Sequence, residues 1–401
     1  MKKFFYVAIA ATALASCSSD NLVDLKEGDE IKITAVADND SRAADVYCNN
    51  NLPNSFYVWA NNSSSKAFMA GDLYKNDGAN GTTYTSNVVR YWPEDGALNF
   101  FALNTNAVAY TNGGVPSIEG FVPETTVGNQ FDIVYATTMG ATKPNSGGAV
   151  AMNFRHALSQ IEFQAKNTNP TIEVEIEEVV VGNAIAKGSF VLPQISTTDK
   201  YGEHNGGTTA NTTIAAQGVW TLGSEVQNYI VTSISDAAIL HTADDPTNLT
   251  CATGADAFTP ADALTPAKDW SKTMLLLPQA STTAWNKATV TPVVDGAGTN
   301  GTYLGVKCRI YNVVTVGETK ERTLIYGGND GKWALVPVLF NWQQGKKYVY
   351  TFVFAAGENA GLTPDGKEVL ENISLEVTVD DFILGEQPAD TEMNVEPVQN
   401  N

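Results

Sequence analysis

The sequence is poor in the residues from which most active sites are built. Its 401 residues contain three histidines, His156, His204 and His241. Zinc proteases, redox dithiols, P-loop NTPases and serine hydrolases each require a short motif, and neither HExxH, CxxC, a Walker loop nor GxSxG occurs. The sequence therefore predicts a protein that is not an enzyme and that needs no cofactor.

Basic residues and long apolar runs are also scarce. Lysine and arginine number 24 against 44 aspartates and glutamates, which gives a formal net charge of −20. A phosphate backbone would be repelled by this excess of negative charge, so no nucleic-acid partner is expected. After Leu14 no uncharged apolar stretch is long enough to cross a bilayer, so the remaining chain is expected to be soluble.

The first twenty residues form an export signal that ends at a cysteine. Two lysines precede an apolar run over residues 4–14, which is too short to span a membrane. The following Leu-Ala-Ser-Cys resembles the lipobox of bacterial lipoproteins. This resemblance implies a signal peptide over residues 1–16, cleavage between Ser16 and Cys17, and acylation of Cys17. Incorporation of palmitate would report this lipid anchor. Residues 18–20 resemble a tether for export to the cell surface and outer membrane. The alternative is a secreted protein whose cut falls at a cysteine by chance.

Hydrophobic residues recur at every second position in several segments. The pattern is clearest over residues 31–35, 172–177 and 348–354. A period of two places each set of side chains on one face of a β-sheet. Short strands, many Gly, Asn, Thr and Ser turns, and no amphipathic helix longer than two turns predict an all-β protein of antiparallel sandwiches.

The length of the chain predicts two or three folded domains. A turn-rich segment at residues 143–148, Lys-Pro-Asn-Ser-Gly-Gly, would serve as the linker between them. The predicted organisation is a signal peptide over 1–16, a tether with an N-terminal strand over 17–42, a first sandwich over 43–145, a second sandwich over 146–384, and an acidic tail over 385–401.

Two motifs point toward ligands but are better explained as turns. Residues 296–301, Gly-Ala-Gly-Thr-Asn-Gly, fit GxGxxG, yet a dinucleotide needs a helix after the glycines and residues 303–310 alternate as a strand. We interpret the glycines as a hairpin tip. Acidic turns at 244–245 and 329–331 lack the spaced oxygens of a calcium loop.

Three further cysteines are widely spaced and odd in number: Cys48, Cys251 and Cys308. No metal site or disulfide framework is therefore expected.

Tryptophans offer one other kind of site. Seven are present, and an exposed indole could stack on a sugar ring. Any of the seven could form such a platform, for example Trp220 or Trp285, although most tryptophans are buried.

Five further segments follow one another along most of the chain. They are Phe-Tyr-Val-Trp-Ala at 56–60, Arg-Tyr-Trp-Pro at 90–93 running into Leu-Asn-Phe-Phe-Ala at 98–102, Phe-Arg-His-Ala-Leu-Ser-Gln-Ile at 154–161, Leu-Leu-Leu-Pro-Gln at 275–279, and Gly-Lys-Lys-Tyr-Val-Tyr at 345–350. Behind a lipobox, this order resembles the successive landmarks of the fimbrillin family, the subunits of type V pili in Bacteroidales. His156, in the third segment, is expected to be a structural histidine rather than a ligand.

The resemblance implies a fold and an assembly mechanism. Fimbrillins are two transthyretin-like antiparallel β-sandwich domains in tandem, exported as lipoproteins, cut after an arginine and polymerised by donor-strand exchange. The matching removable strand contains Ile31, Ile33 and Ala35, which we expect at a sheet edge. The matching processing bond is Arg42–Ala43, and an uncut loop arginine is the alternative. The implied partners are other pilus subunits in a homo- or heteropolymer, the outer membrane, and a host or bacterial surface ligand.

The C-terminal region departs from the family pattern. Residues 373–379 alternate as a strand, but after Leu384 the large apolar side chains are Met393, Val395 and Val398. A tail of this composition is a poor donor strand. Stalk, tip and anchor subunits therefore all stay open. A second class also stays open, a surface lipoprotein that binds glycans through its sandwiches and never polymerises.

Overall fold

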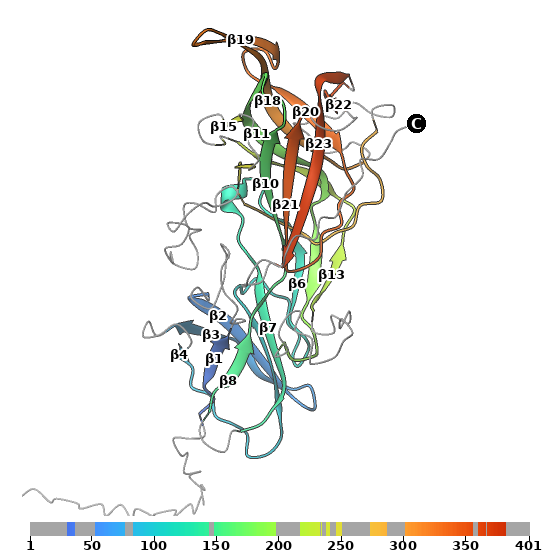
Figure 1. The fold of residues 1–401 in the computed structure, drawn as a ribbon. Helices are drawn as coiled ribbons and strands as arrows, with labels where there is room; N and C mark the ends of the chain where they lie inside the picture. The colour runs from blue at the N-terminus through green and yellow to red at the C-terminus, as the bar shows by residue number, and fades with distance from the viewer. Residues whose placement is uncertain are drawn as a thin grey trace, which may run out of the picture.

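In the computed structural model the regular elements of the described residues are almost all β-strands (Figure 1). The structure describes residues 30–36, 53–76, 83–143, 148–197, 217–232, 234, 238–240, 246–250, 273–286, 301–355, 360–365 and 367–381. Within these ranges the single helical element is a 3₁₀ turn, η2, at Val127–Asn129. No helix in this part of the chain is long and apolar enough to cross a membrane. The predicted all-β class is confirmed.

The N-terminal half forms one eight-stranded sheet. In spatial order its strands are β8 (Val150–Asn153), β1 (Ile33–Val36), β4 (Thr83–Ser86), β3 (Ala67–Asn76), β2 (Ser55–Asn62), β5 (Leu98–Leu103), β7 (Val134–Ala141) and β9 (Arg155–His156). The sheet curls so that rings from distant strands meet on its inner face. The ring centroid of Phe56 lies 4.6 Å from that of Tyr84 and 4.8 Å from that of Phe154. These side chains belong to one hydrophobic core.

The C-terminal half forms a larger sheet system around a second core. Along its main path the strands are β14 (Val226–Val231), β11 (Ile172–Ile185), β18 (Tyr303–Val316), β20 (Lys332–Pro337), β22 (Ala360–Leu362), β23 (Glu368–Asp381), β21 (Lys346–Phe354), β10 (Ser159–Asn167) and β16 (Thr247–Asn248). Three shorter strands pair beside this path: β15 (Ala238–Leu240), β17 (Met274–Leu276) and β19 (Thr319–Tyr326). The alternation predicted over 348–354 is confirmed, because Tyr348, Tyr350, Phe352 and Phe354 all enter this core.

A third sheet joins the two halves. It pairs β6 (Ser117–Phe121) with β12 (Gly188–Val191), which pairs in turn with β13 (Val219–Leu222). The core beneath it draws on both halves, and the rings of Tyr135 and Phe190 lie 5.1 Å apart there. Gln344 donates a 2.6 Å hydrogen bond to the Tyr135 hydroxyl. Burial raises the pKa of Tyr135 to about 12, so the hydroxyl stays protonated at neutral pH. The halves lie end to end and share this core (Figure 1).

Two features of the pairing differ from the sequence expectation. The first sandwich was expected to end at residue 145, but β8 and β9 follow that residue and pair within the first sheet. The first sheet therefore extends to His156. In addition, β1 pairs in parallel with β8, and β10 pairs in parallel with β21, whereas the other pairings between strands are antiparallel. A tandem pair of transthyretin-like domains stays a prediction.

Candidate functional site

The predicted removable strand, β1, is an inner strand of the first sheet. It lies between β8 and β4, parallel to the first and antiparallel to the second. The expected edge position is therefore wrong, since β8 covers the outer side of β1. The register aligns Ile33 with Val150 on one side and with Tyr84 on the other. The backbone amide of Val150 donates a 2.8 Å hydrogen bond to the carbonyl of Lys32.

The side chains of the β1 segment alternate between core and surface. Ile31, Ile33 and Ala35 are 3%, 0% and 0% exposed, whereas Lys32 is exposed. The three inward side chains belong to the core of the first sheet. The sequence pattern predicted this alternation, and the structure shows that the three inward side chains form part of the core.

The landmark segment at residues 90–93 fixes the start of this strand. The amide of Ile31 donates a 2.7 Å hydrogen bond to the carbonyl of Arg90. The guanidinium of Arg90 in turn binds both carboxylate oxygens of Asp72, at 2.6 and 3.1 Å. The Asp72 hydrogen bond raises the pKa of Arg90, and Trp92 packs edge-on against Phe100 at 5.9 Å. Sequence reasoning used this segment for recognition and missed its contact with β1.

Sequence reasoning also missed β8, the second partner of β1. Val150 and Met152 are buried and alternate with exposed Ala151, so a strand could have been read from the sequence. The segment is short, however, and follows the turn-rich residues that were taken for a linker. A pattern of three residues gives no indication of a partner more than a hundred positions away.

Several predicted sites lie outside the described residues. These are Ser16 and Cys17 of the signal, the Arg42–Ala43 bond, Cys48 and Cys251, the glycines of residues 296–300, and the tail over 385–401. After the glycine motif, the strand expected over 303–310 is confirmed as the first part of β18. Cys308, on that strand, is a free buried cysteine, and burial raises the pKa of its thiol.

The two tryptophans proposed as sugar platforms pack against protein. Trp285 is 1% exposed and its ring lies 6.1 Å from that of Tyr303. Trp220 is half-buried, lies 5.0 Å from the Phe190 ring, and donates a 2.7 Å hydrogen bond from its indole nitrogen to the carbonyl of Ala157. Trp285 is therefore part of a core, and Trp220 packs against one.

His156 occupies a structural position, as expected. It is 7% exposed and its Nδ1 lies 2.5 Å from Oδ2 of Asp132, which is 1% exposed. The pair ties β9 to the turn that precedes β7. In the described ranges no group of three or more His, Cys, Asp or Glu side chains is placed to hold a metal ion.

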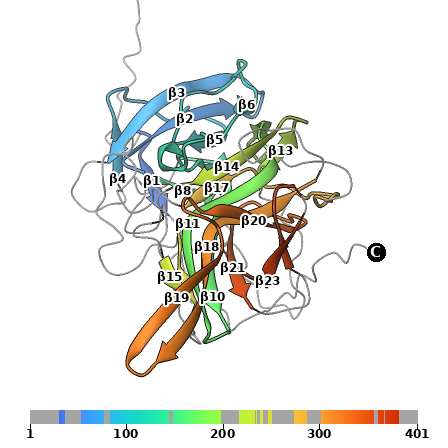
Figure 2. The ribbon, with the colours of Figure 1, turned by 90° about the horizontal axis from the view of Figure 1, so that it is seen from above.

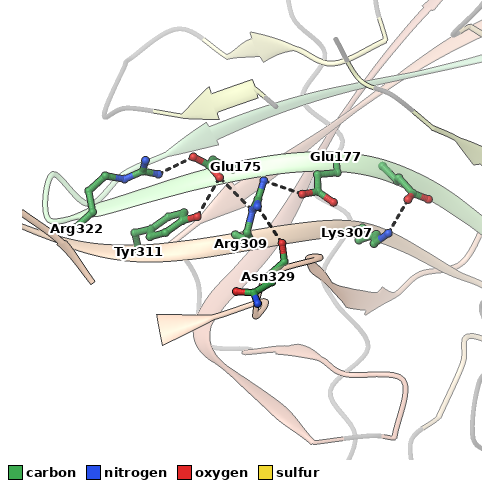
Figure 3. A network of polar contacts seen from close by, with 8 residues as sticks. Glu175, Glu177, Lys307, Arg309, Tyr311, Arg322 and Asn329 are labelled. Atoms are coloured by element: carbon green, nitrogen blue, oxygen red, sulfur yellow. Dashed lines mark hydrogen bonds and ion pairs between the residues drawn. The ribbon is translucent and has the colours of Figure 1, made fainter. Parts of the chain in front are cut away.

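A network of charged side chains covers the outer face of the second sheet system (Figure 3). Glu175 of β11 accepts hydrogen bonds from Arg322 at 2.7 Å and from the Tyr311 hydroxyl at 3.1 Å. Arg309 of β18 forms ion pairs with Glu175 at 3.1 Å and with Glu177 at 2.8 Å. The guanidinium of Arg322 also lies 3.9 Å from the centre of the Tyr311 ring.

Further ion pairs extend this network in both directions. Arg322 and Lys320 of β19 reach Glu173, at 3.0 and 3.7 Å. Lys307 of β18 donates a 2.8 Å hydrogen bond to Glu178. The glutamates of β11 are thus matched by bases on β18 and β19, and the contacts fasten a hairpin that stands out from the body in two views (Figures 1 and 2). The network is a structural clamp, because its acidic and basic side chains pair with one another.

We predict that this clamp gives the protein an acid-sensitive component of stability. Burial raises the pKa of Glu175, but hydrogen bonds from Arg322 and Tyr311 and the charges of Arg322 and Arg309 outweigh it, so the pKa is lowered on balance. A lowered carboxyl pKa stabilises the folded state above the unfolded value of about 4.3, and that stability is lost as the pH falls through the folded pKa. Glu175→Gln should therefore be less stable than the wild type at pH 7, and the gap should narrow below about pH 4. Denaturant midpoints across pH measure this, with exposed Glu318→Gln as control, and a gap independent of pH would contradict it.

The described residues define one class of protein. It is an all-β chain of two sheet systems with a shared core, and its first sheet contains a short, apolar N-terminal strand. The chain belongs to the fimbrillin-like family, whose sequence model matches residues 23–381. No curated protein matches the chain significantly.

Solved structures of several bacterial proteins are similar to this chain. An inferred cell adhesion protein of Bacteroides uniformis is 13% identical with a TM-score of 0.40, over 89% of this chain and 100% of its own. One from Bacteroides ovatus is 12% identical with a TM-score of 0.42, over 89% and 99%. The tip fimbrial protein Mfa3 of Porphyromonas gingivalis, truncated at its C-terminus, is 10% identical with a TM-score of 0.36, over 88% and 99%.

Proposed function

We propose that this protein is a cell-surface pilus subunit, exported as a lipoprotein, cut after Arg42 and assembled by donor-strand exchange. Membership of the fimbrillin-like family supports a structural or adhesive role in a pilus. The observation that carries the assembly mechanism is the position of β1. A strand that precedes a candidate cut site fills the space between two others, and its apolar side chains complete a core.

Removing β1 would leave a groove with exposed apolar side chains and unpaired backbone groups. Ile31 and Ile33 are almost fully buried, and exposing the inner face would forfeit about 1.5–3 kcal/mol for each such side chain. The facing backbone groups of β8 and β4 would also lose their partners in the sheet. A strand from another subunit could satisfy both requirements by β-augmentation.

One wall of this groove depends on its occupant. Among the described residues β8 pairs with β1 alone, whereas β4 also pairs with β3. A hydrogen bond of 2.7 Å from the Thr138 hydroxyl to the carbonyl of Ala151 is a further tie of β8 to the sheet. Loss of β1 would therefore loosen β8, and an incoming strand would re-form two pairings at once.

The strand predicted over 373–379 is already paired. β23 pairs with β21 from Ile373 to Asp381 and with β22 on its other side. Ile373 and Val377 are buried in the second core. This strand belongs to the fold of its own subunit, so a donor segment must come from elsewhere.

The glycan-binding alternative receives no support from Trp220 or Trp285. Trp285 lies in a core of the fold, and the partly buried Trp220 packs against another. Adhesion to a host or bacterial surface ligand would then rest on another surface, in a stalk, tip or anchor subunit.

A protease-dependent ladder of subunits tests the proposal. Full-length protein treated with a trypsin-like protease should form multimers that resist detergent at room temperature and separate on heating, alone or with a partner subunit. Protein incubated with the inhibited protease is the control and should stay monomeric. If treated protein cleaved at Arg42–Ala43 stays monomeric with every partner subunit supplied, the assembly mechanism is wrong.

A further inference from the structure

The groove that β1 occupies fits inward side chains of unequal size. Its occupant presents isoleucine, isoleucine and then alanine to the core, at residues 31, 33 and 35. All three are at most 3% exposed, so each position is filled by the side chain that it holds. Two large pockets are therefore followed by a small one.

The second pocket is lined from both neighbouring strands. Ile33 is aligned with Val150 of β8 and with Tyr84 of β4, and both of these are buried. The branched side chain of Ile33 is buried between these two strands.

The third pocket is small because large side chains already fill the space around it. Ala35 is aligned with Met152 of β8, which is fully buried, and Phe154 follows two residues later. Residues two apart in an extended chain share a face, and Met152 and Phe154 both belong to the same core as Ala35. The ring of Phe154 is in turn held against that of Phe56 at 4.8 Å. In an interior packed this closely, each added methylene forces neighbouring side chains or backbone to move.

We infer that this groove selects its donor strand by size, and that Ala35 marks the selective position. The accepted partner is a strand of another pilus subunit that runs parallel to β8 and antiparallel to β4, with β1 itself as the template. It carries two large aliphatic residues and then alanine, glycine or serine, each two positions apart. Strands with leucine or phenylalanine at the third position are rejected. The inference rests on the proposed function and adds to it which strands the subunit takes.

Strand exchange with labelled peptides tests the selectivity. The full chain, cut at Arg42–Ala43 with its fragment still bound, is incubated with an excess of fluorescent peptide spanning residues 30–38. Three peptides are compared: the native sequence, Ala35→Leu, and Lys32→Leu as the control that adds the same side chain at an exposed position. The native and Lys32→Leu peptides should be taken up equally, and the Ala35→Leu peptide should bind at least about tenfold more weakly.

The outcomes separate the inference from the function on which it rests. Equal uptake of all three peptides would overturn size selection and leave strand exchange standing. Failure of the native peptide to enter would overturn strand exchange, and the selectivity with it. A second measurement needs no exchange: in the uncut full chain, Ala35→Leu should lower the midpoint of thermal unfolding while Lys32→Leu should not. Equal midpoints for these two variants would overturn the small third pocket.

Discussion

Replacing Arg42 with alanine is expected to leave the protein monomeric and anchored, with no ladder of subunits. Trypsin-like proteases require a basic residue before the cut, because their specificity pocket carries a carboxylate. Without the cut, β1 stays covalently attached to the sheet that it completes. An attached strand competes with any donor at an effective concentration on the order of millimolar, so exchange is suppressed. Size-exclusion chromatography and unheated gels of protease-treated protein measure the result.

The matched control for this variant is Lys143→Ala. Lys143 is the basic residue of the other turn-rich segment, and its loss should leave assembly unchanged. Limited proteolysis is expected to cut first near these two positions. If Arg42→Ala forms the same ladder as the wild type, processing at this bond has no part in assembly.

Replacing Cys17 with alanine is expected to abolish lipid labelling. The thiol of Cys17 is the proposed acceptor of the acyl chain, and the signal is not removed at a lipobox that lacks its cysteine. The variant should therefore accumulate as an uncleaved precursor or be released, without labelled palmitate. Stable anchoring by acyl chains depends on the buried methylene groups, so no attachment through lipid is expected. Metabolic labelling and membrane fractionation provide the measurement.

Cys48→Ala is the control for the anchor. It removes a different cysteine close to the first and should keep both the label and the membrane association. Undiminished palmitate labelling of Cys17→Ala, together with unchanged partitioning to the membrane, would show that the anchor lies elsewhere.

Sequence patterns did not predict which distant segments of the chain pair with one another. The Thr34 hydroxyl reaches the carbonyl of Val150 across 116 positions of sequence, at 3.5 Å. The alternation of residues 31–35 predicts a strand with one apolar face, but it is the same for an edge strand and an inner one. The inner position, with β8 on the outer side, follows from tertiary packing alone.

Sequence patterns also did not predict which polar and aromatic side chains are buried. Glu173 and Glu175 occupy the polar positions of an alternating strand, yet they are 6% and 9% exposed because arginine and lysine side chains from β18 and β19 lie over them. Trp220 and Trp285 carry no mark in the sequence that separates a core indole from an exposed one. Their partners come from strands far away in the chain.

Local patterns in the sequence predicted several of the strands and the set of side chains that each presents to one sheet face. The predicted alternations over 172–177, 348–354 and 373–379 appear as β11, β21 and β23, because a period of two is a local property of extended backbone. Tertiary structure alone decided the neighbours: the place of β1 between β8 and β4, the extension of the first sheet to His156, and the core shared by both halves. These depend on which apolar faces meet, and the free energy of that burial is shared among residues that no local pattern connects.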